Sequence, residues 1–267
     1  MDWHQYAKHR DRISSSSGGW TINGKSTLHG FDTHHELTPN ASWIQTLALA
    51  ITGHLYSKNE ARLIEAMYVV TGYADPRIWC NRVVALAGSS RVPAAHSLAA
   101  GIASAEAKLY GWQATFHAAR VIQRAQQINK EHGESDLIDY VKEIITNDRA
   151  LPGFGRPLTG VEERIAPLDK MAAELGVEVG PHLQVSRLIE ELLKNKCLFM
   201  NYGGYVAARL LDMGFDPVSV YRISILAFFT GLVPCYIEAF ENEPGTFLPI
   251  ACEDILYEGR EERPLPE

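Results

Sequence analysis

Apolar residues recur at helical spacing along most of the chain. In residues 43–55 they fall three or four positions apart, as on one face of an α-helix, at Ile44, Leu47, Ala48, Ile51 and Leu55. Ser57 and Glu60 then have the spacing of a capping box, so a second helix is expected to begin there. Its apolar side is formed by Leu63, Ile64, Met67, Tyr68 and Thr71. The pattern predicts two packed helices.

The same periodicity predicts further helices downstream. The expected ranges are 94–107, 114–131, 135–146, 162–174, 186–194, 205–213 and 217 to about 232. Gly133, Gly176 and Gly214 are predicted stops. Residues 94–107 are dominated by Ala, Gly and Ser, whose small side chains let another helix approach closely. We expect this segment to be a central or dimer-interface helix.

Residues 10–40 lack the helical spacing of apolar residues that most of the chain shows. Short apolar pieces at 20–22 and 28–31 are broken by Gly and Pro, which predicts turns and one hairpin. No segment alternates like the strands of a larger sheet, and no internal repeat is found. The predicted fold class is all-α.

Composition and charge narrow the class of function. The 267 residues are 46% hydrophobic and 21% charged, an ordinary globular composition, and the net charge of -7 argues against a nucleic-acid partner. No run reaches the roughly 18 apolar residues of a membrane span, so a soluble, cytoplasmic protein without a membrane partner is expected. The four cysteines have no zinc-site spacing, and His34-His35 is interpreted as a surface pair; no metal is expected.

Three ordered stretches resemble one family. LPGFGRPLTGVEER at 151–164 resembles the loop P-G-[YF]-G-H-x-x-L followed by D-P-R of citrate synthases. SLAAGIASAEAKLYGW at 97–112 is similar to the helix and turn ending in L-H-G-G, and LFMNYGGYV at 198–206 to the V-D-F-Y-S-G stretch. Looser similarity at 64–77 and 231–241 extends the resemblance over most of residues 28–241. We therefore identify the chain by resemblance as a member of the citrate synthase and citryl-CoA lyase superfamily.

The resemblance implies a helical, two-domain, homodimeric enzyme that binds a CoA thioester in a cleft and makes or breaks an adjacent carbon-carbon bond. It implies a large domain from residues 1–112 and 216–267 and a small domain from residues 113–215. The implied ligands are coenzyme A, as acyl-CoA, and a small carboxylate or ketone.

Several positions depart from the family pattern. Tyr110 and Arg156 stand where the resemblance implies catalytic histidines, and Met200 where it implies the catalytic Asp. Met200 has no removable proton, and Asn201 beside it only forms hydrogen bonds. Tyr110 can donate to a developing oxyanion, with amphipathic packing as the alternative. Arg156 offers a fixed cation for a carboxylate or enolate but is a poor general acid.

The remaining candidates are assigned by position. Asp75 is a candidate surviving acid or a turn cap before Pro76, and Tyr73 lies beside it in the expected substrate region. Arg164 matches the family's carboxylate-binding Arg, with an ion pair to Glu162 or Glu163 as the alternative, while Phe228 replaces a second such Arg. Pro152, Gly153, Phe154 and Gly155 are predicted to contact CoA, the two glycines being alternatively plain turn residues.

Three functions stay open from the sequence. The leading hypothesis is cleavage or condensation of an acyl-CoA, with retro-Claisen cleavage favoured because the carbon base lost at Met200 is then needed only to protonate an enolate. The second is a non-catalytic or regulatory homologue, since several catalytic positions differ at once. The third is different chemistry, such as hydrolysis or decarboxylation, on a substrate with fewer carboxylates.

Overall fold

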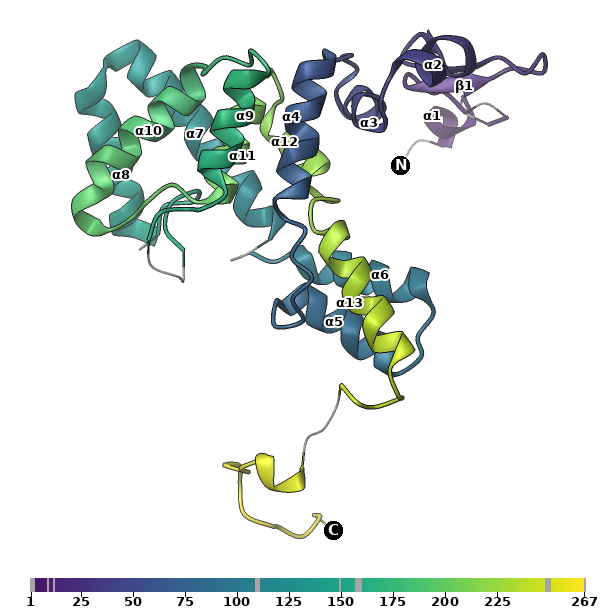
Figure 1. Ribbon diagram of the computed structural model, residues 1–267, viewed down its shortest axis with the longest axis vertical. Coiled ribbons are helices and arrows are strands. Elements are labelled where there is room, and N and C mark those ends of the chain that lie inside the picture. The colour runs from purple at the N-terminus through teal and green to yellow at the C-terminus, as the bar shows by residue number, and fades with distance from the viewer. Residues whose placement is uncertain are drawn as a thin grey trace. The chain divides into compact units, whose positions relative to one another are not determined.

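The structure is a computed structural model that describes residues 3–8, 10–11, 13–108, 111–148, 150–156, 160–247 and 251–266. The chain forms two compact units (Figure 1). Unit 1 consists of Met1–Tyr73 and Ala105–Thr230, and unit 2 of Ala74–Ser104 and Gly231–Glu267. The domain boundaries expected from the resemblance are a separate division of the chain and stay a prediction.

Unit 1 begins with a small sheet and continues as helices. Strands β1 (Gly18–Trp20), β2 (Ser26–Leu28) and β3 (Phe31–Asp32) form an antiparallel sheet in that order. The sequence predicted one hairpin here, so the third strand is a correction: the tight Leu28↔Phe31 pairing turns the chain back within two residues. The short helical elements nearby are α1 (Trp3–Ala7), η1 (Thr33–Leu37) and α2 (Thr38–Asn40).

Helices make up most of the remaining chain. Unit 1 holds α3 (Trp43–Thr52), α4 (Lys58–Val69), α7 (Trp112–His132), α8 (Glu134–Asp148), α9 (Ile165–Glu174), α10 (Pro181–Leu193), η2 (Lys194–Lys196), α11 (Tyr202–Asp212) and α12 (Pro217–Ser224). Unit 2 holds α5 (Trp79–Ser89), α6 (Ala94–Ala105) as far as Ser104, most of α13 (Phe229–Glu241), and η3 (Cys252–Asp254). The all-α prediction is confirmed.

Local signals set several helix starts. Ser42 with Gln45, and Ser57 with Glu60, both form complete capping boxes, in which each side chain satisfies a backbone amide of the other residue. Helix α3 ends at Gly53, whose φ of 75° is a left-handed conformation that glycine adopts without strain. The predicted helix from Ser57 is therefore confirmed with its cap.

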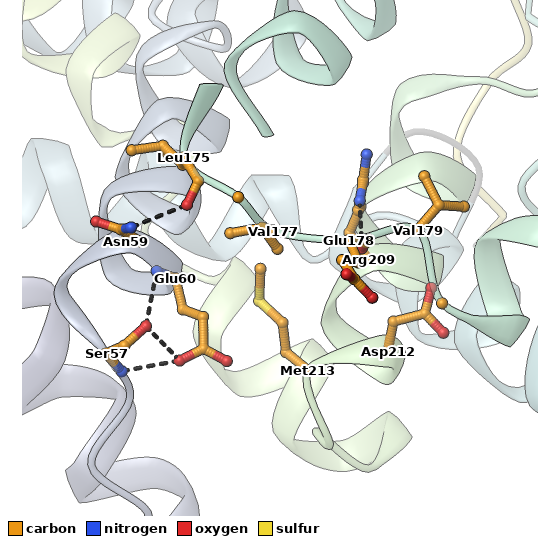
Figure 2. Close-up of a pocket in the computed structure, with 12 residues that line it drawn as sticks. Ser57, Asn59, Glu60, Leu175, Val177, Glu178, Val179, Arg209, Asp212 and Met213 are labelled. Atoms are coloured by element: carbon orange, nitrogen blue, oxygen red, sulfur yellow. Dashed lines mark hydrogen bonds between the residues drawn. The ribbon is translucent and has the colours of Figure 1, made fainter. Parts of the chain in front are cut away.

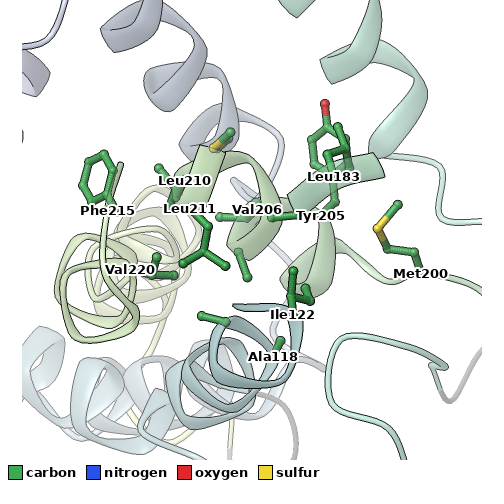
Figure 3. Close-up of a cluster of buried hydrophobic side chains, with 14 of the residues drawn as sticks. Ala118, Ile122, Leu183, Met200, Tyr205, Val206, Leu210, Leu211, Phe215 and Val220 are labelled. Carbon is green, nitrogen blue, oxygen red and sulfur yellow. The ribbon is translucent and has the colours of Figure 1, made fainter. Parts of the chain in front are cut away.

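The hydrophobic core of unit 1 is built around α7. This helix contacts α8, α10, α11 and α12. Ala118 and Ile122 on α7 face Val206 and Leu211 on α11 in a shared cluster of buried side chains (Figure 3). Close packing on both sides holds α7 and α11 together, and the predicted site residues Met200 and Asn201 directly precede α11.

Unit 2 confirms the close approach predicted for the small-residue helix. A Cβ added at Gly101 on α6 would lie 2.5 Å from Val84 Cγ1 and 3.1 Å from Leu232 Cδ2. Helices α5 and α13 therefore approach α6 too closely for a larger side chain at this position. The role of α6 in a dimer stays a prediction.

The apolar stretch near the C-terminus was predicted as one helix and is two. Residues 225–228 form turns between α12 and α13, because Tyr68 donates to the Ile223 carbonyl and Thr71 to the Ala227 carbonyl at 2.6 Å. Within the described ranges, Pro217–Glu241 is long and apolar enough by composition to cross a membrane. However, 44% of its most apolar window is buried, and core helices of soluble proteins meet the same criterion.

We predict that Ser57→Ala lowers the free energy of unfolding by about 1 kcal/mol, because it removes the acceptor for the Glu60 amide at 3.2 Å. Urea denaturation followed by circular dichroism measures the change. Ser14→Ala, at an exposed serine before the sheet, is the control. An equal effect of both substitutions would show that the cap contributes nothing specific.

Candidate functional site

The glycine loop predicted from the sequence is bound to the start of α11. Phe154 and Met200 form an antiparallel bridge, and the Gly155 amide donates to the Phe199 carbonyl at 2.7 Å. The Asn201 amide donates to the Gly153 carbonyl at 2.9 Å. The loop thus positions the first turn of α11 through backbone contacts.

Two glycines make this contact possible. Gly153 has a φ of 90°, and a Cβ there would lie 3.0 Å from the Gly204 Cα and 3.1 Å from the Ala118 Cβ. A Cβ at Gly204 would lie 2.2 Å from the Gly153 carbonyl oxygen. The loop, α7 and α11 therefore meet at a point where only glycine fits.

The N-terminal ends of α7 and α11 lie side by side. A Cβ at Gly203, in the first turn of α11, would contact the Thr115 hydroxyl in the first turn of α7 at 3.3 Å. Asn201 caps α11 by accepting from the Gly204 amide at 3.0 Å, and its side-chain amide donates to the Gly155 carbonyl at 2.8 Å. Both ends carry the partial positive charge of a helix N-terminus, which favours anions.

Glu162 is the buried anion at this position. Its side chain is 1% exposed and accepts two hydrogen bonds from Arg164, at 2.7 and 3.0 Å. It also accepts from the Tyr202 amide at 3.1 Å and lies 3.5 Å from Arg156 Nη1. Burial acts to raise the pKa of Glu162, but the hydrogen bond and charge of Arg164, the Tyr202 amide and Arg156 outweigh it and lower the pKa.

Arg156 lies between two carboxylates of different exposure. Its two Nη atoms both bond to Glu163, whose side chain is 59% exposed, whereas Glu162 beside it is buried. The hydrogen bond from Arg156 lowers the pKa of Glu163. Arg156, Glu162, Glu163 and Arg164, which we call the arginine cluster, carry two positive and two negative charges in close contact.

Two tyrosines flank Arg164. Its Cζ lies 4.5 Å from the centre of the Tyr202 ring and 5.8 Å from that of Tyr73. Tyr202 donates to the Met67 carbonyl, and burial raises its pKa, so it is a neutral donor in the folded chain. Tyr73 is 43% exposed. The guanidinium of Arg164 is thus held by Glu162 and the face of Tyr202, while Nη1 has no partner within the described residues.

An aromatic pair lies at the start of α7. Trp112 is 3% exposed and stacks on Phe228 with ring centres 4.3 Å apart. The indole Nε1 is buried and has no hydrogen-bond partner among the residues described. The Thr71 bond to the Ala227 carbonyl places this segment beside the end of α4, close to Tyr202.

The other candidates lie in different environments. Met200 is buried in the core cluster, 2% exposed, and its amide donates to Glu190 (Figure 3). Asp75, in unit 2, accepts from the Arg77 amide and pairs with its guanidinium at 2.6 Å, which lowers the pKa of Asp75 to about 2. Tyr110 lies outside the described residues. The structure thus brings together Arg156, Asn201, Arg164 and Tyr73.

A separate cavity lies at the opposite end of α11. It has a volume of about 540 Å³ and is lined by the start of α4, residues 175–180 and the residues Arg209, Asp212 and Met213 (Figure 2). Its polar groups are largely engaged: Arg209 donates to the Glu178 carbonyl at 3.0 Å and Asp212 caps α10. None of the residues predicted for the site lines it.

Comparison with known proteins identifies the family. A family model described as "Citrate synthase, C-terminal domain" matches residues 12–244. This chain belongs to the citrate synthase family. A search of curated proteins finds no match.

Solved structures of citrate synthase relatives show the same fold. A citryl-CoA lyase from Hydrogenobacter thermophilus is 24% identical with a TM-score of 0.80, over 95% of this chain and 97% of that one. A Methanosaeta concilii ATP citrate lyase with (3S)-citryl-CoA is 17% identical (TM-score 0.72), over 98% of this chain but 45% of its own. A Thermoplasma acidophilum citrate synthase with carboxymethyl-CoA and oxaloacetate is 18% identical (TM-score 0.65), over 86% and 60%.

Sequence reasoning missed two contacts at the candidate site. Glu162 was considered only as a possible partner of Arg164, although it also holds Arg156 and the start of α11. Trp112 ends the stretch that resembles the L-H-G-G turn, but its packing on Phe228 was not predicted. Both contacts join segments that are distant in the sequence. The only sequence feature that could have indicated one of them is the position of Glu162 between Arg156 and Arg164.

We predict that Glu162→Gln lowers the free energy of unfolding by about 3 kcal/mol, because it leaves Arg164 and Arg156 without their buried counter-charge. The neighbouring Glu163→Gln is the matched control and should cost less than about 1 kcal/mol, as expected for an exposed pair. Urea denaturation of both variants measures the two changes in the free energy of unfolding. Equal costs would contradict the central role of Glu162.

A pH dependence arises from the lowered pKa of Glu162. Near its ordinary value of 4.5 the unfolded chain binds more protons here than the folded chain does. The stabilisation is therefore present above about pH 4.5 and is lost as the pH falls through the lowered pKa. Thermal unfolding at pH 7 and at acid pH should show the gap between the native protein and Glu162→Gln narrowing. A gap that is constant with pH would refute the assignment.

Proposed function

We propose that this citrate synthase family member cleaves a citryl-CoA-type thioester by a retro-Claisen reaction at the arginine cluster. The observation that carries the proposal is the convergence of Arg156, Arg164 and the starts of α7 and α11 on one location. These groups together form a site suited to carboxylates and to a developing enolate.

The ligands of two similar structures, the citrate synthase and the ATP citrate lyase, support the proposed class of substrate. These two relatives carry a CoA analogue with oxaloacetate and citryl-CoA, respectively. A CoA thioester and a small carboxylate are therefore the proposed substrates.

The proposed cleavage proceeds from the substrate hydroxyl to an enolate. A base removes the proton of the substrate hydroxyl, the adjacent carbon-carbon bond breaks, and its electron pair moves to the carbon next to the thioester. The products are a ketone and an enolate, which a water proton converts to the acyl-CoA. Tyr110 would stabilise the enolate oxygen, while Arg156 and Arg164 would hold substrate carboxylates, Arg164 through Nη1.

The glycine loop is proposed to contact CoA through its exposed side. Phe154 is buried, and the amides of Phe154 and Gly155 donate to the Leu151 and Phe199 carbonyls. Pro152 and Gly155 are partly exposed. These two residues are the proposed contacts, and the loop otherwise positions Asn201 and α11.

The Trp112–Phe228 stack favours a second candidate. Phe228, on which Trp112 stacks, stands where the family resemblance implies a carboxylate-binding Arg, so the substrate would carry one carboxylate fewer than citrate. The same fold would then cleave or decarboxylate a less charged acyl-CoA. We further propose that the protein is a cytoplasmic homodimer; light scattering after size-exclusion chromatography tests the dimer.

We predict that Arg156→Ala lowers kcat/KM for citryl-CoA cleavage about 100-fold, the scale of losing one charged donor to a substrate carboxylate. Release of acetyl-CoA, followed by chromatography, measures it. Arg62→Ala, on the exposed surface of α4, is the control and should keep full activity. If the native protein releases no product from any CoA thioester, a ligand-binding regulatory homologue is the better description.

A further inference from the structure

The two carboxylates of the arginine cluster are not equivalent. Glu162 is buried and bonded to Arg164 and the Tyr202 amide, so it cannot leave without unpairing buried groups. Glu163 is largely exposed and, within the described residues, its side chain forms an ion pair with Arg156 alone. Glu162 is a fixed part of the fold, whereas the Glu163 carboxylate can be replaced on Arg156 by another carboxylate.

The contact between Glu163 and Arg156 has the form of ligand recognition. Nη1 and Nη2 of Arg156 approach both oxygens of the same carboxylate, the fork geometry by which a guanidinium binds a carboxylate. The Arg156 side chain is 20% exposed, and that of Glu163 is 59% exposed. An exposed pair of this kind contributes little free energy, so another carboxylate can displace it.

We infer that Glu163 is an internal stand-in for a substrate carboxylate: it occupies Arg156 in the free protein and sets the affinity for carboxylate ligands by competing with them. On binding, the ligand carboxylate takes the place of Glu163 on Arg156, and Glu163 turns to solvent. Glu162 stays bonded to Arg164 throughout. This inference rests on the proposed function only for the identity of the ligand.

The competing explanation is that Glu163 merely holds Arg156 in position. The two explanations predict opposite changes in the affinity for a carboxylate when Glu163 is removed. If Glu163 competes, its removal strengthens carboxylate binding, whereas if it only orients Arg156, its removal weakens binding.

The test measures citrate binding by isothermal titration calorimetry at low ionic strength. For Glu163→Gln and Glu163→Ala the dissociation constant should fall about threefold, the scale of an exposed ion pair. Glu65→Gln removes a charge of similar exposure, paired with Arg62 at 2.9 Å on α4, and should leave the constant unchanged. Thermal melts verify that each variant is folded.

The outcomes separate the inference from the proposed function. An unchanged or raised dissociation constant in both Glu163 variants, or an equal fall in Glu65→Gln, overturns the inference. Tighter citrate binding in a protein that cleaves no CoA thioester supports the inference and refutes the proposed cleavage. Native protein that binds no citrate overturns both.

Discussion

The buried carboxylate of Glu162 is the contact on which the site depends. It bonds to Arg164 and to the first amide of α11, and it also lies beside Arg156. Because α11 packs on α7, this one side chain connects the site to the core of unit 1. A buried anion at a helix start is stabilised by the helix dipole and by its two cations, which explains why its pKa is lowered despite burial.

Much of the fold was predictable because its signals are local. The capping box of Ser57 and Glu60, the small residues of α6 and the periodicity of α7 each act within one segment. The start of α10 was placed too late because its cap is Asp212, thirty positions away, whose carboxylate accepts from the His182 and Leu183 amides. The break after α12 was missed for the same reason, since hydroxyls from α4 and the residues after it bind carbonyls of the 223–227 segment. Helix α5 was not predicted, and no side chain among the described residues caps its start.

The candidate site, like the fold, was predictable only where its signals are local. Motif order pointed to Arg156, Arg164 and Asn201, and the structure brings them together. Their pairing was not predictable, because two adjacent glutamates, equivalent in the sequence, differ in burial: Glu162 is enclosed by Arg164 and Tyr202, while Glu163 faces solvent. The residues of the arginine cluster could therefore be located from the motifs, but the different burial of its two glutamates could not.

A crystal structure with citrate and CoA tests the central claim most directly. We predict a citrate carboxylate on Arg156 and within reach of Arg164 Nη1, Glu163 displaced, and Glu162 still bonded to Arg164. Citrate bound only elsewhere, such as in the cavity at the far end of α11, or a Glu162 that releases Arg164 on binding, would contradict it.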